Sequence, residues 1–319
     1  MTAPPSGGRA RTAFLGSGAF GLEALRRLHG HPDVELVGVV TAPPRPAGRG
    51  RRPTPTGIDI AAQELGVPVI LRPGRLRAPD AVADVLALRP DLLVLADYGQ
   101  IVPAPLLDVA HGALNLHPSL LPRWRGASPI PAAILAGDAK TGVTLMRMGA
   151  GLDTGPIVAQ EAVTLTGRET APDLEERLAL LAAGLLERSL GAWLDGRLEA
   201  RPQPVEGATL TRPLRREDGR LDPARSAAEL ERQVRAHQPW PGTFLELDGE
   251  RLVVTRASVV PGAPGDRPGE LVTEGGWPAV ATAGGRLVLE ALTPAGRRPM
   301  PGDAWLRGFR RQPVSESPR

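Results

Sequence analysis

Asn115 and His117 are the residues whose types and spacing could do chemistry. They stand two apart, after the apolar approach Gly112-Ala113-Leu114. Residues two apart in an extended chain point to the same face, so both side chains would leave the end of a strand together. A carboxamide can hydrogen-bond a developing oxyanion, and an imidazole with a usual pKa of about 6.5 can carry a proton between two nitrogens. The pair therefore suits acyl or formyl transfer.

A carboxylate that could orient the imidazole stands further along the chain. Asp153 lies in the run Gly151-Leu-Asp-Thr-Gly-Pro156. A carboxylate beside a histidine holds the ring in place and favours its protonated form. The triplet Asp-Thr-Gly is also found in ordinary turns and in aspartic proteases, but here it occurs once and has no partner carboxylate in a similar context. We therefore take Asn115, His117 and Asp153 as a candidate catalytic trio.

Short apolar strands alternate with helices around these residues. The apolar pattern predicts strands at 11–16, 34–40, 67–71, 91–96, 113–117 and 142–148, and helices at 22–28, 58–65, 81–88 and 128–135. Such alternation is typical of a Rossmann-like, doubly wound α/β domain with a mostly parallel sheet. In that fold residues 115 and 117 would stand at the end of a strand.

The second part of the chain has a different pattern. A long amphipathic helix at 174–194 precedes the proline-rich run Arg201-Pro-Gln-Pro204. Five short strands separated by close turns then suggest a small OB-like β-barrel, a common nucleic-acid platform, at 244–247, 252–255, 270–272, 279–282 and 287–292. We predict a Rossmann-like catalytic domain at 1–200, a linker at 201–213 and an OB-like domain at 214–319.

Composition and charge exclude several classes of protein. The 319 residues include no cysteine, so there is no disulfide framework, thiolate nucleophile or cysteine-based metal site. The five histidines are scattered, and we predict no metal site. No apolar run approaches the roughly 20 residues of a membrane helix, and residues 1–8 do not resemble a signal peptide. A cytoplasmic protein is the natural interpretation.

The net charge of +3 does not by itself indicate a nucleic-acid binder, but basic residues cluster. The segment 36–58 has no acidic residue, which suits either a phosphate-bearing substrate or a solvated surface loop, and contains Arg45, Arg49, Arg51 and Arg52. A second motif, Gly16-x-Gly18-x-x-Gly21, matches the dinucleotide fingerprint. The acidic residue expected at the end of the following strand is missing, so a tight turn explains these glycines better.

Taken together, three runs resemble the formyltransferases that use 10-formyltetrahydrofolate. They are Asn115-x-His-Pro-Ser-Leu-Leu-Pro-x-Trp-Arg-Gly126, Gly142-Val-Thr144 and Gly151-Leu-Asp-Thr-Gly155. Two further runs are similar to the branch of that family that formylates methionyl-tRNA: Arg45-Pro-Ala-Gly-Arg-Gly-Arg-Arg52 and Gln238-Pro-Trp-Pro-Gly242. The resemblance covers about residues 11 to 310.

The resemblance implies a role for individual residues. Asn115, His117 and Asp153 match the catalytic trio of the family. Contacts to the folate co-substrate are implied for Ser119, Leu120, Leu121 and Pro122 and, in the turn that receives the pterin, for Tyr98, Gln100 and Val102. Insertion into the acceptor arm of the tRNA is implied for the loop that contains Arg45, Arg49, Arg51 and Arg52. A monomer without a membrane or metal partner is expected.

Three positions depart from the family pattern. Asp97 stands where a small apolar residue is usual, Pro44 where an acidic residue precedes the basic loop, and Pro223 where an aromatic residue follows Leu-Asp. None belongs to the trio. Three alternatives stay open: a sugar-nucleotide or glycinamide ribonucleotide formyltransferase, a formyltetrahydrofolate hydrolase, and a non-catalytic RNA-binding protein on a Rossmann-like scaffold.

Overall fold

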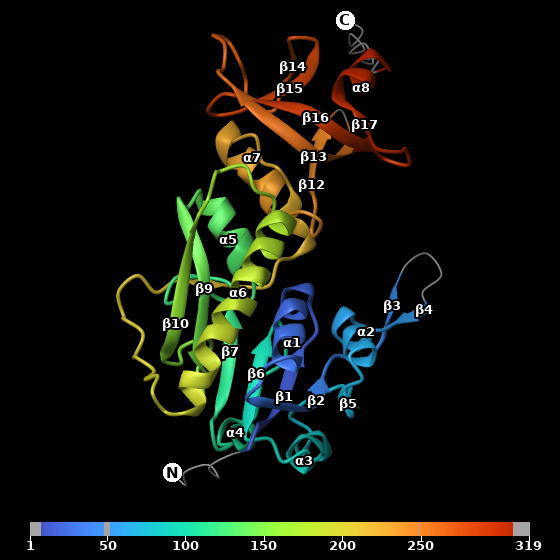
Figure 1. Cartoon of the computed structure of the whole chain (residues 1–319). Coiled ribbons are helices and arrows are strands. Elements are labelled where there is room, and N and C mark those ends of the chain that lie inside the picture. Colours follow the sequence, from blue (N-terminus) through green and yellow to red (C-terminus); the bar gives the residue numbers. More distant parts are fainter. Residues whose placement is uncertain (1–7, 48–51, 248, 309–319) are drawn as a thin grey trace, which may run out of the picture. The chain divides into compact units, whose positions relative to one another are not determined.

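The computed structural model describes residues 8–47, 52–247 and 249–308, and the chain divides into two compact units (Figure 1). The first unit comprises Met1–Ala133, Asp138–Thr166 and Asp173–Pro213. The second comprises Leu214–Arg319 together with two short segments, Ile134–Gly137 and Gly167–Pro172. The residues 201–213, expected to be a linker, therefore pack as part of the first unit.

A seven-stranded sheet forms the centre of the first unit. Its strands, in spatial order, are β10 (Ile157–Thr164), β9 (Lys140–Arg147), β7 (Ala113–His117), β6 (Leu92–Ala96), β1 (Ala10–Gly16), β2 (Val34–Val40) and β5 (Ile70–Leu71). The pairs from β5 to β7 are parallel, whereas β9 runs antiparallel to both of its neighbours. The sheet is thus mostly parallel and Rossmann-like, as the alternating pattern predicted.

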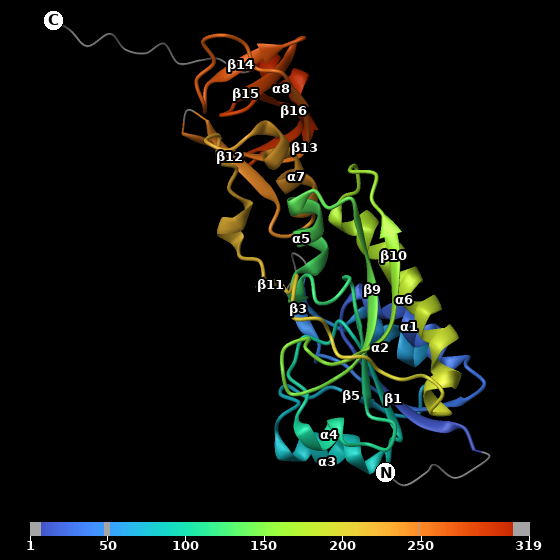
Figure 2. The ribbon, with the colours of Figure 1, turned by 90° about the vertical axis from the view of Figure 1, so that its left-hand side faces the viewer.

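Helices cover both faces of this sheet. Figure 2 shows α1 and α6 on one side and α3 and α4 on the other. The helices up to residue 194, with one 3-10 turn, are η1 (Ala19–Gly21), α1 (Leu22–His29), α2 (Gly57–Glu64), α3 (Pro79–Ala87), α4 (Ala104–Leu107), α5 (Pro129–Ala136) and α6 (Ala171–Leu194). All five residues of β6 are buried, because a central parallel strand is covered on both faces.

Two small strand pairs lie outside the main sheet. β3 (Arg45–Ala47) and β4 (Arg52–Thr54) form an antiparallel pair within the basic segment. β8 (Arg125–Gly126) pairs in parallel with β11 (Leu210–Thr211). The second pair joins the residues that follow the Asn115–His117 strand to the last segment of the first unit.

The second unit is built on an antiparallel sheet in the order β12-β13-β16-β15-β14, with β17 added to β16. Its elements are η2 (Arg216–Gly219), α7 (Ala227–Ala236), β12 (Thr243–Leu247), β13 (Glu250–Val260), β14 (Leu271–Glu274), β15 (Trp277–Ala281), β16 (Arg286–Pro294), β17 (Met300–Pro301) and α8 (Gly302–Gly308). Ser226 and Glu229 form a capping box at the start of α7. One apolar core joins α7, α8 and the strands, and includes Leu230, Leu252, Leu289 and Trp305.

Candidate active site

Asn115 and His117 both lie on β7, between β6 and β9. Asn115 is opposite Leu95 of β6 and Met146 of β9, and His117 is opposite Thr144 of β9. The Asn115 side chain is half-buried, and no described residue hydrogen-bonds its carboxamide. An amide donor on a central strand is thus left available to a ligand.

His117 is 4% exposed and has a defined orientation. Its Nε2 lies 2.8 Å from the carbonyl oxygen of Trp124, and a carbonyl only accepts, so Nε2 carries the proton in the neutral ring. Nδ1 then has the free lone pair, and it faces Oδ2 of Asp153 at 3.8 Å. The ring nitrogen beside the carboxylate is therefore the one that can take up a proton.

Burial decides the protonation state of His117. Desolvation lowers the pKa of the imidazole below its usual value, while the charge of Asp153 and the Trp124 carbonyl act in the opposite direction. We expected Asp153 to favour the protonated ring. It does so, but burial outweighs it, and the resting imidazole is neutral at pH 7. A neutral ring is the form that can accept a proton from an amine.

Asp153 is held from two directions. Its Oδ2 accepts a hydrogen bond of 2.7 Å from the backbone N–H of Gly126, and its own backbone has a positive φ of 48°. Asp adopts this left-handed conformation more readily than most residues. Gly155 closes the turn, because a Cβ there would lie 1.9 Å from the carbonyl oxygen of Arg147. The sequence run Gly151–Pro156 thus forms a turn that aims a carboxylate at His117.

Trp124, which supplies the carbonyl to His117, is itself strongly held. Its φ is 61°, its indole N–H donates to Asp138 at 2.8 Å, and the Arg123 guanidinium lies 4.3 Å from the ring centroid. Arg123 also makes a bidentate pair with Asp138. Together these contacts hold Trp124 in an unusual backbone conformation beside the imidazole.

The predicted folate loop is anchored from within. Ser119 is fully buried, and its hydroxyl donates to the carbonyl of Arg123 at 2.6 Å. Thr144 links the carbonyl of Ser119 to the N–H of Leu121, whose side chain is also buried. Leu120 and Pro122 are half-buried. In this loop, Leu120, Pro122 and backbone groups are the parts that can meet a ligand.

The side chains of the predicted pterin turn are held by the protein itself. The Tyr98 ring is buried in the core with Leu76 and Val102, and burial without a hydrogen-bond partner raises the pKa of its hydroxyl to about 12. Gln100 accepts from the N–H of Leu76 and donates to the carbonyl of Pro73. These side chains therefore support the turn from inside the fold and leave its backbone groups to face outward.

The position of Asp97 explains why a glycine stands at residue 18, in the turn that follows β1. Its carbonyl accepts hydrogen bonds from the N–H groups of Ser17 and Gly18, and a Cβ at Gly18 would lie 1.4 Å from its Oδ2. The carboxylate therefore stands at the turn where a dinucleotide-binding protein would place a phosphate. Asp97 is exposed by surface area, but the protein around its carboxyl still desolvates it and raises its pKa. Burial, and next the charge of Asp97, raise the pKa of Glu175.

The basic segment is only partly described. Arg45 and Arg52 lie on β3 and β4, are exposed, and make no ion pair within the described residues. Arg49 and Arg51 lie outside the described residues. The two described guanidinium groups are thus free to contact a phosphate.

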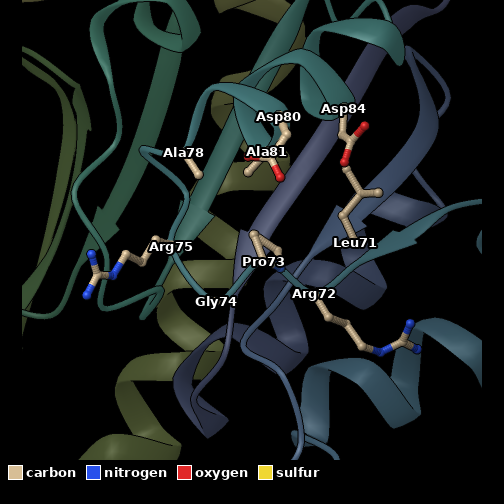
Figure 3. A pocket seen from close by; sticks show the side chains of 9 residues that line it. All are labelled: Leu71, Arg72, Pro73, Gly74, Arg75, Ala78, Asp80, Ala81 and Asp84. Atoms are coloured by element: carbon tan, nitrogen blue, oxygen red, sulfur yellow. The ribbon is translucent and has the colours of Figure 1, made fainter.

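A separate hollow of about 410 Å³ lies at the end of β5, beside the start of α3 (Figure 3). Its lining includes Leu71, Arg75, Asp80 and Asp84 and none of the candidate site residues. Figure 3 shows the side chains of Arg72 and Arg75 leading away from it in opposite directions, and Arg72 pairs with Asp59. We assign it no catalytic role. Among the described residues no group of three histidine or acidic side chains could hold a metal ion.

Comparison with known proteins defines the class to which this fold and site belong. Residues 10–190 match the family model "Formyl transferase", and residues 213–310 match "Formyl transferase, C-terminal domain". The chain belongs to the formyl transferase family. It is 44% identical over 302 residues to the methionyl-tRNA formyltransferase of Roseiflexus sp. (strain RS-1), covering 94% of this chain and 93% of that one. The enzyme of Cereibacter sphaeroides (strain ATCC 17025 / ATH 2.4.3) is 42% identical over 300 residues, covering 94% and 96%. Within the family, the chain belongs to the methionyl-tRNA formyltransferases.

Solved structures share the fold at much lower identity. The N-formyltransferase of Helicobacter canadensis, in complex with folinic acid and dTDP-3-aminofucose, has a TM-score of 0.63 at 14% identity, covering 87% of this chain and 98% of that chain. HypX of Aquifex aeolicus, in complex with tetrahydrofolic acid, has a TM-score of 0.61 at 16% identity, covering 93% and 47%. None of the helices in the described part of this chain is long and apolar enough to cross a membrane.

Proposed function

We propose that this protein transfers the formyl group of 10-formyltetrahydrofolate to the α-amino group of initiator methionyl-tRNA. The observation that carries the proposal is the arrangement of the trio: an unpartnered carboxamide two residues from a neutral imidazole, whose free nitrogen faces a carboxylate at 3.8 Å. The identity of 42–44% to methionyl-tRNA formyltransferases over nearly the whole chain supports this substrate over a sugar nucleotide.

The amine attacks the formyl carbon, and a tetrahedral oxyanion forms as the new C–N bond is made. Asn115 donates a hydrogen bond to that oxyanion. Nδ1 of His117 takes the proton that the attacking nitrogen loses, and Asp153 stabilises the imidazolium. The proton then passes to N10 of the folate as the C–N10 bond breaks. Nε2 stays bonded to the Trp124 carbonyl throughout, so the ring keeps its orientation.

The folate would lie beside the loop Ser119–Pro122 and the turn Tyr98–Val102, with Gln100 and Tyr98 supporting the turn rather than contacting the pterin. The basic segment, with Arg45, Arg49, Arg51 and Arg52, would contact the phosphates of the tRNA acceptor arm. We further propose that the protein is a monomer and works in the cytoplasm, where charged tRNA is found. Size-exclusion chromatography with light scattering tests the first of these statements.

One experiment separates this function from its rivals. The protein is incubated with 10-formyltetrahydrofolate and charged initiator tRNA, and the aminoacyl product is analysed after mild hydrolysis. Formylmethionine is the expected product. Release of formate without formylmethionine would identify a hydrolase instead, and turnover of an amino-sugar nucleotide but not of the tRNA would identify the rival branch.

A further inference from the structure

Residues 201–213, the last segment of the first unit, contact the active-site loop directly. Thr209 accepts from the N–H of Trp124 at 2.8 Å through its hydroxyl, and its carbonyl accepts from the N–H of Arg125 at 2.9 Å. The hydroxyl of Thr211 donates to the carbonyl of Arg125 at 2.9 Å. Gly126 packs so closely that a Cβ there would lie 2.2 Å from the Thr211 carbonyl oxygen. The loop that serves His117 and Asp153 is therefore braced by residues about 85 positions later.

Gln203, in the same segment, joins that loop to the Asp153 turn. Its Nε2 donates to the carbonyl of Asp153 at 2.8 Å and to the carbonyl of Gly155 at 2.7 Å. Its Oε1 accepts from Nε and an Nη of Arg125 at 3.0 and 2.7 Å. All four hydrogen-bonding positions of one half-buried carboxamide are thus used, and they connect the two backbone segments that flank the His117–Asp153 pair.

We propose that Gln203 is a positioning residue: it holds the Asp153 turn at a set distance from Gly126 and His117. This role rests on the formyl transfer proposed above. Gln203 bonds to both of the segments that position the Asp153 carboxylate. Arg125 immediately precedes Gly126, whose N–H holds the Asp153 carboxylate, and the Asp153 and Gly155 carbonyls belong to the turn that carries that carboxylate. Gln203 touches neither the imidazole nor a reacting atom, so it acts through Asp153.

The chemistry of the side chain explains why a glutamine serves here. Two backbone carbonyls need donors, and the Arg125 guanidinium needs an acceptor. A carboxamide supplies both, whereas a carboxylate would face the two carbonyls with lone pairs and an ammonium would face the guanidinium with like charge. The turn also holds Asp153 at positive φ, a conformation that persists only where its surroundings enforce it. Without the four hydrogen bonds of Gln203, the turn can relax and the Asp153 carboxylate can move away from Nδ1 of His117.

The test uses the full-length protein and two readouts. Gln203→Met keeps the length of the side chain and removes all four hydrogen bonds. We expect kcat for formylmethionyl-tRNA formation to fall roughly 10- to 100-fold, in line with the effect of a displacement of about 1 Å in a catalytic group, with both KM values changed less than about threefold. NMR titration of the histidine ring protons, with His117→Gln to assign the signal, should show the pKa of His117 moving to a lower value, because the favourable charge of Asp153 is then further away.

Gln203→Asn and Gln233→Met complete the experiment. Gln203→Asn keeps the carboxamide on a shorter side chain. It should lower kcat and the pKa of His117 as Gln203→Met does, but by smaller amounts. If Gln203→Met does not fold, Gln203→Asn provides the test. Gln233 of α7 donates to two backbone carbonyls and accepts from an arginine in the same pattern, so Gln233→Met is a matched control that should leave the His117 titration unchanged.

Two outcomes would overturn the positioning role. One is a kcat within threefold of wild type with an unmoved His117 titration, and the other is a loss of kcat with an unmoved titration, which indicates a merely structural contribution. The NMR readout does not depend on the substrate. A wild-type protein that forms no formylmethionyl-tRNA would therefore refute the proposed function, while the titration would still decide the role of Gln203.

Discussion

Replacing Asp153 by asparagine removes one charge and little else. Asparagine has the same shape and tolerates the positive φ of this position, and its carbonyl can still accept the hydrogen bond from Gly126. What disappears is the negative charge 3.8 Å from Nδ1 of His117. Because the resting imidazole is neutral, the charge matters most when the ring carries the proton of the attacking amine. The substitution therefore acts on the transition state more than on substrate binding.

The size of the effect follows from the separation of the two groups. Two opposite unit charges at this distance attract by about 4 kcal/mol at an effective dielectric constant of about 20, which corresponds to roughly 10³ in rate. The side chains of His117 and Asp153 are only 6% and 15% exposed, so solvent screening is weak. We expect kcat of Asp153→Asn to fall by about this factor, with KM for folate and tRNA nearly unchanged.

The assay is single-turnover formation of formylmethionyl-tRNA with enzyme in excess, so that product release does not mask the chemical step. Asp59→Asn is the matched control, because Asp59 is a more deeply buried carboxylate of the same unit that pairs with Arg72 and faces no histidine. It should lose stability but keep its rate. A rate for Asp153→Asn within threefold of wild type would refute the assignment of Asp153.

Three other perturbations test separate parts of the account. Asn115→Ala should lower kcat by about 10² to 10³ with little change in folate affinity, measured by steady-state kinetics and equilibrium binding, and wild-type turnover would exclude it as the oxyanion donor. Because burial lowers the pKa of His117, and the neutral ring is the working base, the acid limb of the kcat/KM–pH profile should lie below about 6.5; a limb above that value would contradict the neutral resting state. Arg49→Ala should raise the apparent KM for tRNA and weaken its dependence on salt, and an unchanged salt slope would argue against a phosphate contact there.

The arrangement of the first unit could be predicted because its strands are apolar on both faces. The run 91–96 was predicted as a buried strand, and β6 occupies Leu92–Ala96. β10 was missed because it lies at the edge of the sheet, where only Val158 is buried, so the strand has no continuous apolar run. The strand predicted at 67–71 shortens to Ile70–Leu71, since Val67 caps the end of α2 instead. In the second unit the five predicted strands correspond to β12 through β16.

The candidate site was less accessible to sequence reasoning. Spacing along β7 was enough to place Asn115 and His117 on one strand, and the structure brings Asp153 to the same place. The tautomer of His117 depends on the carbonyl of Trp124, whose direction follows from a loop conformation that residue types do not reveal. Gln203 left no signal, because a single glutamine between two prolines looks like part of a spacer. Its role depends on a long-range contact that no local pattern encodes.

The pairing of β3 with β4 affects which parts of the sequence can vary without loss of stability. Pro46 stands opposite Pro53, so neither supplies an N–H to the ladder, and the three residues of β4 are exposed. An isolated hairpin of this size contributes little free energy of its own. The basic segment can therefore be lengthened, shortened or exchanged with little effect on the folding of the seven-stranded sheet, so the tRNA contact proposed for it is free to diverge while the catalytic residues stay constant.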